Sequence, residues 1–298
     1  MSLDRAVRAR TPTLWALWKL ARPAQLLLIL LVYALGVSIA AATGTPLDAR
    51  VLYGALALLP TAASVHYANE YADYETDRLT ERTPFSGGSG ALVETGLPRS
   101  LARNATLASA GVAALAALLA VSLLPPLALL LLVAIAVLGW GYSLPPLRFS
   151  RRGLGEVDNS LLGGLVLPVY GAAVVAGPLP LVALSVVPFT CLVFCNLLAT
   201  QWPDRAADEE TGKHTLVVRW SESRIERLHG LAAMVGMATL AALDLQGVYP
   251  PIVTLASLPA FGLAAWAVRR FPDDDPLPSV AAMVALAAGQ TLAWASLI

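Results

Sequence analysis

The segment Asn69-Glu70-Tyr71-Ala72-Asp73-Tyr74-Glu75-Thr76-Asp77-Arg78 places an amide and several carboxylates at the end of a long apolar run. Asn69, Asp73 and Asp77 are four residues apart, so they share one face if the segment is helical. Carboxylates this close repel one another and are difficult to bury beside a membrane. Because a divalent cation would make such a stripe of oxygens favourable, the segment predicts a metal site.

A second acidic segment, Gln201-Trp202-Pro203-Asp204-Arg205-Ala206-Ala207-Asp208, follows another apolar run and repeats the four-residue spacing of its aspartates. Gly212-Lys213-His214-Thr215 comes a few residues later. A single acidic stripe is common on solvated helix faces. Two stripes at the ends of apolar runs, each with basic residues just beyond it, indicate a shared site.

The composition is that of a membrane protein. Of the 298 residues, 57% are hydrophobic and 13% are charged, whereas a soluble domain carries about 25% charged residues. The formal net charge of zero gives no reason to expect a nucleic-acid partner. Cys191 and Cys195 lie one helical turn apart in an apolar run, too few ligands for a zinc site, and we interpret them as helix-packing residues.

The apolar runs predict an all-α membrane protein. A spanning helix needs about 20 mostly apolar residues. Nine segments meet this length, near 22–43, 51–69, 103–123, 126–143, 157–176, 180–200, 228–246, 250–269 and 279–297. Residues 1–21 precede them and mix basic residues with Leu14, Trp15, Leu17 and Trp18, a pattern typical of a short helix at the headgroup level. Its basic residues are Arg5, Arg8, Arg10 and Lys19.

The connections between these segments alternate in charge. Those near 70–102, 144–156, 201–227 and 270–278 hold most of the charged residues. Those near 124, 177–179 and 247–249 hold none, and the one near 44–50 holds only Asp48 and Arg50. The positive-inside rule then predicts a cytoplasmic N-terminus in the cell membrane. Both acidic segments, at the starts of 70–102 and 201–227, fall on that cytoplasmic side.

This arrangement of charges suits a diphosphate. Mg²⁺ typically takes one or two protein carboxylates and fills its other positions with water and phosphate oxygens. Metals and basic side chains together would stabilise the negative charge that develops on a departing diphosphate. The basic candidates, each of which could instead be a membrane anchor, are Arg78, Arg82, Arg148, Arg205 and Lys213.

Thr83-Pro84-Phe85-Ser86-Gly87-Gly88-Ser89-Gly90, here called the glycine-rich segment, lies between Arg82 and Arg99. Glycine lets backbone N–H groups approach an anion closely, so we interpret the segment as a lid over an anion or substrate rather than as a flexible connector.

A diphosphate site at the ends of membrane helices fits a lipid-soluble substrate such as a polyprenyl diphosphate. Loss of the diphosphate makes the allylic carbon electrophilic, and the cation must be shielded from water. Aromatic faces can stabilise such a cation, although in membrane helices they more often pack or anchor. The candidates are Tyr67, Tyr71, Tyr142, Phe194 and Trp202.

Asn69-x-x-x-Asp73-x-x-x-Asp77, followed by Asp204-x-x-x-Asp208 and Gly212-Lys213-x-Thr215, resembles the UbiA superfamily of intramembrane prenyltransferases. The similarity covers nearly the whole chain and includes Arg22-Pro23 and Tyr142-Ser143-Leu144-Pro145-Pro146-Leu147-Arg148. The resemblance implies a single domain over residues 1–298. It also implies a helical bundle around a central cavity, Mg²⁺ dependence, and prenyl transfer from a diphosphate to an acceptor.

The resemblance also implies roles for individual residues. Asn69, Asp73 and Asp77 would hold one Mg²⁺, Asp204 and Asp208 the other, and Lys213 would contact the diphosphate. Many relatives carry an asparagine just before the second aspartate pair. Here Thr200 and Gln201 stand closest and Asn196 lies two turns earlier, so Gln201 is the candidate for that amide. The expected substrate-binding residues are Asn69, Arg78, Arg82, Tyr142, Arg148, Gln201 and Arg205.

Within the superfamily, residues 83–93 and Gly153-Leu154-Gly155-Glu156 look most like the 1,4-dihydroxy-2-naphthoate polyprenyltransferases of menaquinone synthesis. The alternative acceptors are 4-hydroxybenzoate, a chlorophyll-type tetrapyrrole, haem and an archaeal glycerol phosphate ether. From a different class, a cation-coupled transporter would usually place its carboxylates near the bilayer midplane on broken helices. Here the carboxylates cluster on one face of the membrane, which favours the enzyme.

Overall fold

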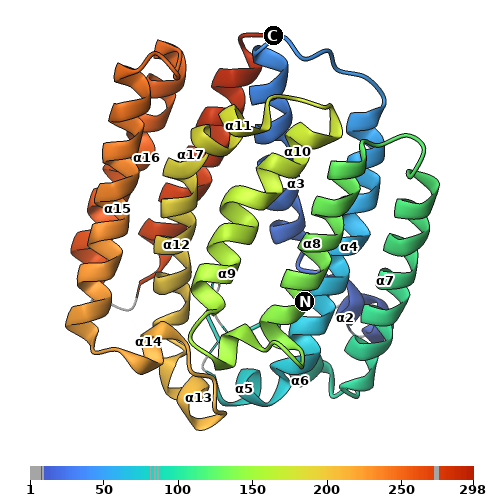
Figure 1. The fold of residues 1–298 in the computed structure, drawn as a ribbon. Helices are drawn as coiled ribbons and strands as arrows, with labels where there is room; N and C mark the ends of the chain where they lie inside the picture. Colours follow the sequence, from blue (N-terminus) through green and yellow to red (C-terminus); the bar gives the residue numbers. More distant parts are fainter. Residues whose placement is uncertain (1–7, 9, 81, 84, 86, 272–274) are drawn as a thin grey trace.

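The structure is a computed structural model that describes residues 8, 10–80, 82–83, 85, 87–271 and 275–298. All regular elements in these residues are helices, as predicted, and no strand occurs among them. The long helices run side by side as a bundle, and short helices gather at one end of it (Figure 1). The uninterrupted long helices are α3 (Pro23–Ala42), α4 (Arg50–Ala72), α7 (Ser100–Leu119), α8 (Pro126–Ser143), α15 (Glu222–Leu245), α16 (Pro251–Arg270) and α17 (Leu277–Ala295).

Two further spans are irregular. One consists of α9 (Gly155–Leu161), the π-helical turn η2 (Leu162–Val166) and α10 (Leu167–Val174) in direct succession. The other consists of α11 (Leu179–Ser185) and α12 (Val187–Gln201), which meet at a bend of 47°. In the described residues, eight helices are long and apolar enough to cross a membrane, or nine when α11 and α12 count as one span. This agrees with the nine predicted spans.

The bend between α11 and α12 follows from Pro188, the second residue of α12. Proline has no backbone N–H to donate to the preceding turn, and its ring clashes with the carbonyl four residues earlier. The hydroxyl of Tyr249 donates to the carbonyl of Ser185, at the end of α11. A side chain thus satisfies a carbonyl next to the bend.

Glycine lets α3 and α10 pack closely. A Cβ atom added to Gly36 would lie 1.7 Å from the carbonyl oxygen of Pro168, and one added to Gly171 would lie 2.3 Å from that of Tyr33. Small residues permit such backbone approach between membrane helices, where apolar burial gives little drive for association. These contacts join the first span to the middle of the bundle.

The short helices α5 (Tyr74–Leu79), α6 (Ala91–Thr95), α13 (Arg205–Glu210) and α14 (Leu216–Arg219) lie at the lower end of the bundle in Figure 1. They lie in the connections 70–102 and 201–227, which were predicted only as charged loops. The 3₁₀ turn η1 (Phe149–Arg151) belongs to a third charged connection.

The predicted N-terminal helix is present as α2 (Pro12–Leu20). Trp15, Ala16 and Leu20 are buried against Ala91 and Leu92 of α6. Leu14 and Trp18 face outward with 67% and 63% of their surface exposed. One face of α2 therefore packs against the protein and the other is exposed, and its place at the headgroup level stays a prediction. Arg5 lies outside the described residues.

Two helix boundaries differ from the predicted ones, one at the start of α15 and one at the end of α7. α15 begins at Glu222, before the predicted start at 228, because its first two turns are polar but still helical. α7 ends at Leu119, short of the predicted 123, although residues 120–123 are mostly apolar. Hydrophobicity reports burial in the bilayer rather than the end of the hydrogen-bonded helix.

Candidate active site

The first acidic motif, Asn69, Asp73 and Asp77, crosses a helix junction rather than lying on one unbroken helix. α4 ends at Ala72, α5 begins at Tyr74, and Asp73 stands between them. The Asp73 N–H donates to the carbonyl of Asn69 at 2.8 Å, and the Asp77 N–H donates to that of Asp73 at 2.9 Å. Hydrogen bonds of helical spacing therefore continue through the junction, and Asn69, Asp73 and Asp77 keep the predicted helical spacing of four residues.

The second acidic motif, Asp204 and Asp208, is built on α13. Asp204 occupies the N-cap position without a capping hydrogen bond from its side chain, and Asp208 lies inside the helix. Gly212 follows the helix with a φ of +72°, which glycine adopts without a Cβ clash. The Gly212 N–H then donates to the Glu209 carbonyl at 3.1 Å, and the Lys213 N–H to the Asp208 carbonyl at 2.8 Å. This pair of bonds is a Schellman motif, and it turns Lys213 back toward α13.

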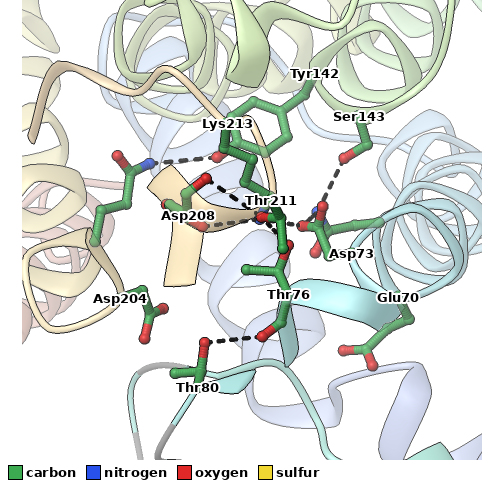
Figure 2. Close-up of polar contacts among 12 residues, drawn as sticks. Glu70, Asp73, Thr76, Thr80, Tyr142, Ser143, Asp204, Asp208, Thr211 and Lys213 are labelled. Carbon is green, nitrogen blue, oxygen red and sulfur yellow. Dashed lines mark hydrogen bonds and ion pairs between the residues drawn. The ribbon is translucent and has the colours of Figure 1, made fainter. Parts of the chain in front are cut away.

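Lys213 joins the two acidic motifs (Figure 2). Its Nζ lies 3.0 Å from Oδ2 of Asp73 and 3.4 Å from Oδ1 of Asp208. All three residues are buried, with 8%, 8% and 4% of their surface exposed. The Thr76 and Thr211 hydroxyls, 2.8 Å apart, link the same two segments. Two motifs far apart in the sequence thus form one charged cluster.

Polar side chains of α4 and α8 orient Asp73. The Asn69 amide Nδ2 donates to Oδ2 of Asp73 at 2.7 Å and to the hydroxyl of Ser143 at 2.9 Å. Figure 2 shows Ser143 and Tyr142 at the end of α8, on the side of the cluster that faces the bundle. Asp73 is therefore held by both Lys213 and Asn69.

The electrostatics of the cluster favour a further cation. Burial, together with the charges of Asp73 and Glu70, raises the pKa of Asp77 to about 7. Burial raises the pKa of Asp208 to about 6, with Lys213 opposing the shift. Burial would lower the pKa of Lys213, but the charges of Asp73 and Asp208 outweigh it and hold that pKa above its ordinary value. The carboxylates are thus only partly neutralised by Lys213.

The donor set fits Mg²⁺ but does not form a complete metal site by itself. Within the described residues, no group of three or more His, Cys, Asp or Glu side chains could hold a metal ion. Mg²⁺ commonly takes only one or two protein carboxylates and completes its shell with water and phosphate oxygens. Two carboxylate motifs beside one lysine match that partial set.

Gly87 and Gly88 of the glycine-rich segment contact the two motifs. The Gly87 N–H donates to Oδ2 of Asp204 at 3.3 Å. Gly88 has a φ of +63°, and a Cβ atom there would lie 2.1 Å from Oδ2 of Asp77. Glycine is therefore required at Gly88 for both conformation and close approach. Pro84 and Ser86 of the segment lie outside the described residues.

Two of the predicted basic residues point elsewhere. Arg78 is exposed, lies 3.5 Å from the carboxylate of Glu75 in an exposed pair, and stacks over the ring of Tyr74. Arg148 is exposed and has a φ of +46°. Neither makes a hydrogen bond or ion pair with an aspartate of the two motifs.

Two other basic residues lie closer to the motifs. Arg82 forms an ion pair with Glu94, and its guanidinium packs against Gly90 at the end of the glycine-rich segment. The Arg205 guanidinium lies 4.1 Å from the ring centre of Trp202 and donates to the Trp202 carbonyl at 2.5 Å. These contacts place Arg82 beside the glycine-rich segment and Arg205 at the start of α13.

Tyr142 lies next to Lys213 (Figure 2) and forms a polar pair with Gln201. The Gln201 amide Nε2 donates to the Tyr142 hydroxyl at 3.3 Å. Oε1 of Gln201 is buried and has no hydrogen-bond partner among the described residues. Both predicted substrate-binding residues therefore lie at the cluster, and Gln201 retains an acceptor for a ligand.

Three of the aromatic candidates have packing roles. The Tyr67 hydroxyl donates to the carbonyl of Leu17 in α2 at 3.1 Å. The ring of Tyr71 lies under the Arg99 guanidinium at 4.2 Å. The ring of Trp202 packs against Phe271.

Glu70 was given no role from the sequence, although both of its carboxylate oxygens accept hydrogen bonds near the site. It is 3% exposed and binds both Arg22 and Ser89. Being next to Asn69, it lies about 100° around the helix from the aspartate face, so the four-residue spacing does not include it. The sequence therefore gives no signal that distinguishes Glu70, which is next to the motif but not part of it, from a solvent-exposed acidic residue.

Residues 29–297 match the model of the UbiA prenyltransferase family. A UbiA homologue from Archaeoglobus fulgidus bound to GPP and Mg²⁺ has a TM-score of 0.68 and 16% identity, with 94% of this chain and 99% of that chain covered. An apo UbiA homologue from Aeropyrum pernix K1 has a TM-score of 0.68 and 15% identity, with 89% and 96% covered.

A digeranylgeranylglyceryl phosphate synthase structure has a TM-score of 0.67 and 12% identity, with 95% of this chain and 99% of that chain covered. At these identities, the solved structures show a shared fold. No curated protein sequence gives a significant match. With a family match across nearly its whole length, the chain belongs to the UbiA prenyltransferase family and is a prenyltransferase.

Proposed function

We propose that the chain is an intramembrane, Mg²⁺-dependent enzyme that moves a polyprenyl group from its diphosphate to an aromatic acceptor, 1,4-dihydroxy-2-naphthoate in menaquinone biosynthesis. The observation that carries this proposal is the meeting of the two acidic motifs at Lys213, with its Nζ between Asp73 and Asp208. Structures of a UbiA homologue bound to GPP and Mg²⁺, and to DMAPP and Mg²⁺, support the substrate class.

Asn69, Asp73 and Asp77 would hold one Mg²⁺, and Asp204 and Asp208 the other. When bound, Mg²⁺ supplies positive charge that stabilises the departing diphosphate. The site is buried and its carboxylates are only partly neutralised, so cations and diphosphate would bind there together. The natural partners of the chain are thus a polyprenyl diphosphate, an aromatic acceptor and the lipid bilayer.

The protein's own groups would orient the diphosphate and exclude water. Lys213 is a compact point charge already desolvated at the cluster, and Arg82 lies beside the lid. Tyr142 and Gln201 would contact substrate on the bundle side. Arg78 and Arg205 would contribute only after their side chains move from their contacts with Glu75 and Trp202. Arg148, which is exposed, would have to turn toward the diphosphate.

In the proposed reaction, the allylic C–O bond breaks and the diphosphate leaves with the electron pair. An electron-rich ring carbon of the acceptor forms the new C–C bond. The ring then loses a proton to a base or, for the naphthoate acceptor, loses its carboxylate as CO₂.

We further propose that residues 1–298 form one UbiA-type domain in the cell membrane with a cytoplasmic N-terminus. Residues 1–21 would lie at the interface, and the connections 70–102 and 201–227 would carry the active site on the cytoplasmic side. The alternating charge of the connections supports this orientation.

The test uses purified protein in lipid with Mg²⁺, a polyprenyl diphosphate, and either 1,4-dihydroxy-2-naphthoate or 4-hydroxybenzoate, with products identified by mass. A prenylated naphthoquinol without its carboxylate is the expected product, and EDTA should abolish it. Prenylated hydroxybenzoate alone would overturn the acceptor assignment and leave the reaction class intact. Absence of diphosphate release with any acceptor would overturn the proposed activity.

A further inference from the structure

Glu70 makes contacts that the proposed reaction does not explain. It lies in the last turn of α4 and is 3% exposed. Its Oε1 accepts hydrogen bonds from Nε of Arg22 at 2.7 Å and from the Ser89 N–H at 2.9 Å. Its Oε2 accepts from the Ser89 hydroxyl at 2.7 Å. Both carboxylate oxygens are therefore engaged by groups outside the two acidic motifs.

Ser89 occupies a specific place in the glycine-rich segment. It stands between Gly88 and Gly90, both of which have positive φ. Gly88 packs against the carboxylate of Asp77, and Gly87 donates its N–H to Asp204. The hydrogen bonds that Ser89 donates to Glu70 thus anchor the segment at Ser89. This residue is next to Gly88, which contacts Asp77, and two residues from Gly87, which contacts Asp204.

From this geometry we infer that Glu70 is a positioning residue that acts through Ser89 and holds residues 87–90 against Asp77 and Asp204. This inference rests on the proposed function, because the ligand retained under the segment is the prenyl diphosphate. Backbone N–H groups of a glycine-rich turn suit phosphate oxygens. Releasing Ser89 should therefore weaken diphosphate binding more than it slows the chemical step.

Glu70 has a second partner, so the test must separate two roles. Arg22 opens α3 with a φ of +53° and forms an ion pair with Glu70 at 2.6 Å. Removing the Glu70 carboxylate would leave Arg22 uncompensated and could unfold the protein. Ser89→Ala instead removes the hydroxyl bond to Glu70, together with the bond that the hydroxyl accepts from the Ala91 N–H. It leaves the Ser89 N–H bond to Glu70 and the ion pair with Arg22 intact.

The control is Thr95→Ala in α6. The Thr95 hydroxyl donates to the Ala91 carbonyl and accepts from the Leu97 N–H, so its contacts stay within residues 91–97. Thr95→Ala therefore removes a hydroxyl from the connection 70–102, as Ser89→Ala does, but removes no hydrogen bond to Glu70.

Steady-state kinetics with Mg²⁺ and a polyprenyl diphosphate should give a KM for the diphosphate about tenfold or more higher in Ser89→Ala. The turnover number should change less than about threefold, because the hydrogen bond acts on binding. Hydrogen exchange at the amides of residues 87–90 should be faster in Ser89→Ala and unchanged in Thr95→Ala. The Glu70→Gln, Ser89→Ala double variant should be no worse than the more impaired single variant.

Equal KM values for Ser89→Ala and Thr95→Ala, or unchanged exchange at residues 87–90, would overturn the inference. Additive losses in the double variant would show that Glu70 acts through Arg22 instead. These outcomes differ from failure of the proposed function, in which the unmodified protein itself releases no diphosphate. The exchange measurement needs no turnover, so it reports on the Glu70–Ser89 contact in either case.

Discussion

Replacement of Lys213 by methionine gives the most direct test of the charged cluster. Methionine retains much of the length of lysine but removes the charge between Asp73 and Asp208. Removing one partner of a buried ion pair typically destabilises a protein by about 3–5 kcal/mol, because the remaining charge stays buried. The side chains of Lys213, Asp73 and Asp208 are only 10%, 11% and 5% exposed, so solvent screens them little.

That free energy corresponds to a measurable shift. With an unfolding entropy of about 2 cal/mol/K per residue over 298 residues, it lowers the unfolding temperature by about 5–8 °C. Because Mg²⁺ can supply the missing positive charge, it should stabilise Lys213→Met more than the unmodified protein. The assay is thermal unfolding in detergent micelles, with and without Mg²⁺.

Lys19→Met is the matched control, since Lys19 lies over the Trp15 ring in α2 and, in the part of the chain that the structure describes, forms no ion pair with the two motifs. It should shift the unfolding temperature little. An unfolding temperature for Lys213→Met within 1–2 °C of the unmodified protein, on the scale of about 5–8 °C expected above, would refute the reasoning. If Mg²⁺ raised the unfolding temperature of Lys213→Met and of the unmodified protein equally, this would refute the idea that Lys213 and the metal neutralise the same carboxylates.

Three further outcomes are expected. Asp73→Ala or Asp208→Ala should lower turnover about a thousandfold or more while circular dichroism shows retained helices, and near-normal turnover would exclude these residues as metal ligands. The apparent Mg²⁺ affinity, measured by titration, should fall as the pH falls from 8 to 6: the pKa of Asp77 is about 7 and that of Asp208 about 6, and protons then compete with the metal. A pH-independent affinity would contradict this. Gly88→Ala should raise the KM for the diphosphate far more than Gly96→Ala, since both glycines have positive φ but only a Cβ at Gly88 meets Asp77.

The helical membrane fold could be predicted from the sequence because its cause is local. Each span is a run of apolar residues long enough to cross a bilayer, and a helix satisfies its backbone polar groups within the same run. The same locality explains the prediction of the two acidic motifs, since four-residue spacing reflects helical hydrogen bonds between near neighbours, which continue through the junction of α4 and α5. The Schellman turn at Gly212 is also local, because its two hydrogen bonds join residues 208–213, but it was not predicted from the sequence.

Other features depended on the tertiary structure, because they join segments that the sequence keeps far apart. The ion pair of Lys213 with Asp73 and the bond of Glu70 to Ser89 arise only when α4, α13 and the glycine-rich segment meet at one end of the bundle. Periodicity also could not show that Arg78 points away from the aspartates, since a flexible side chain selects its partner from its surroundings. The sequence by itself determined the helices and the chemical character of their ends. Only the packing of distant segments decided which charges are buried together, because the energy of a charge depends on its neighbours in space.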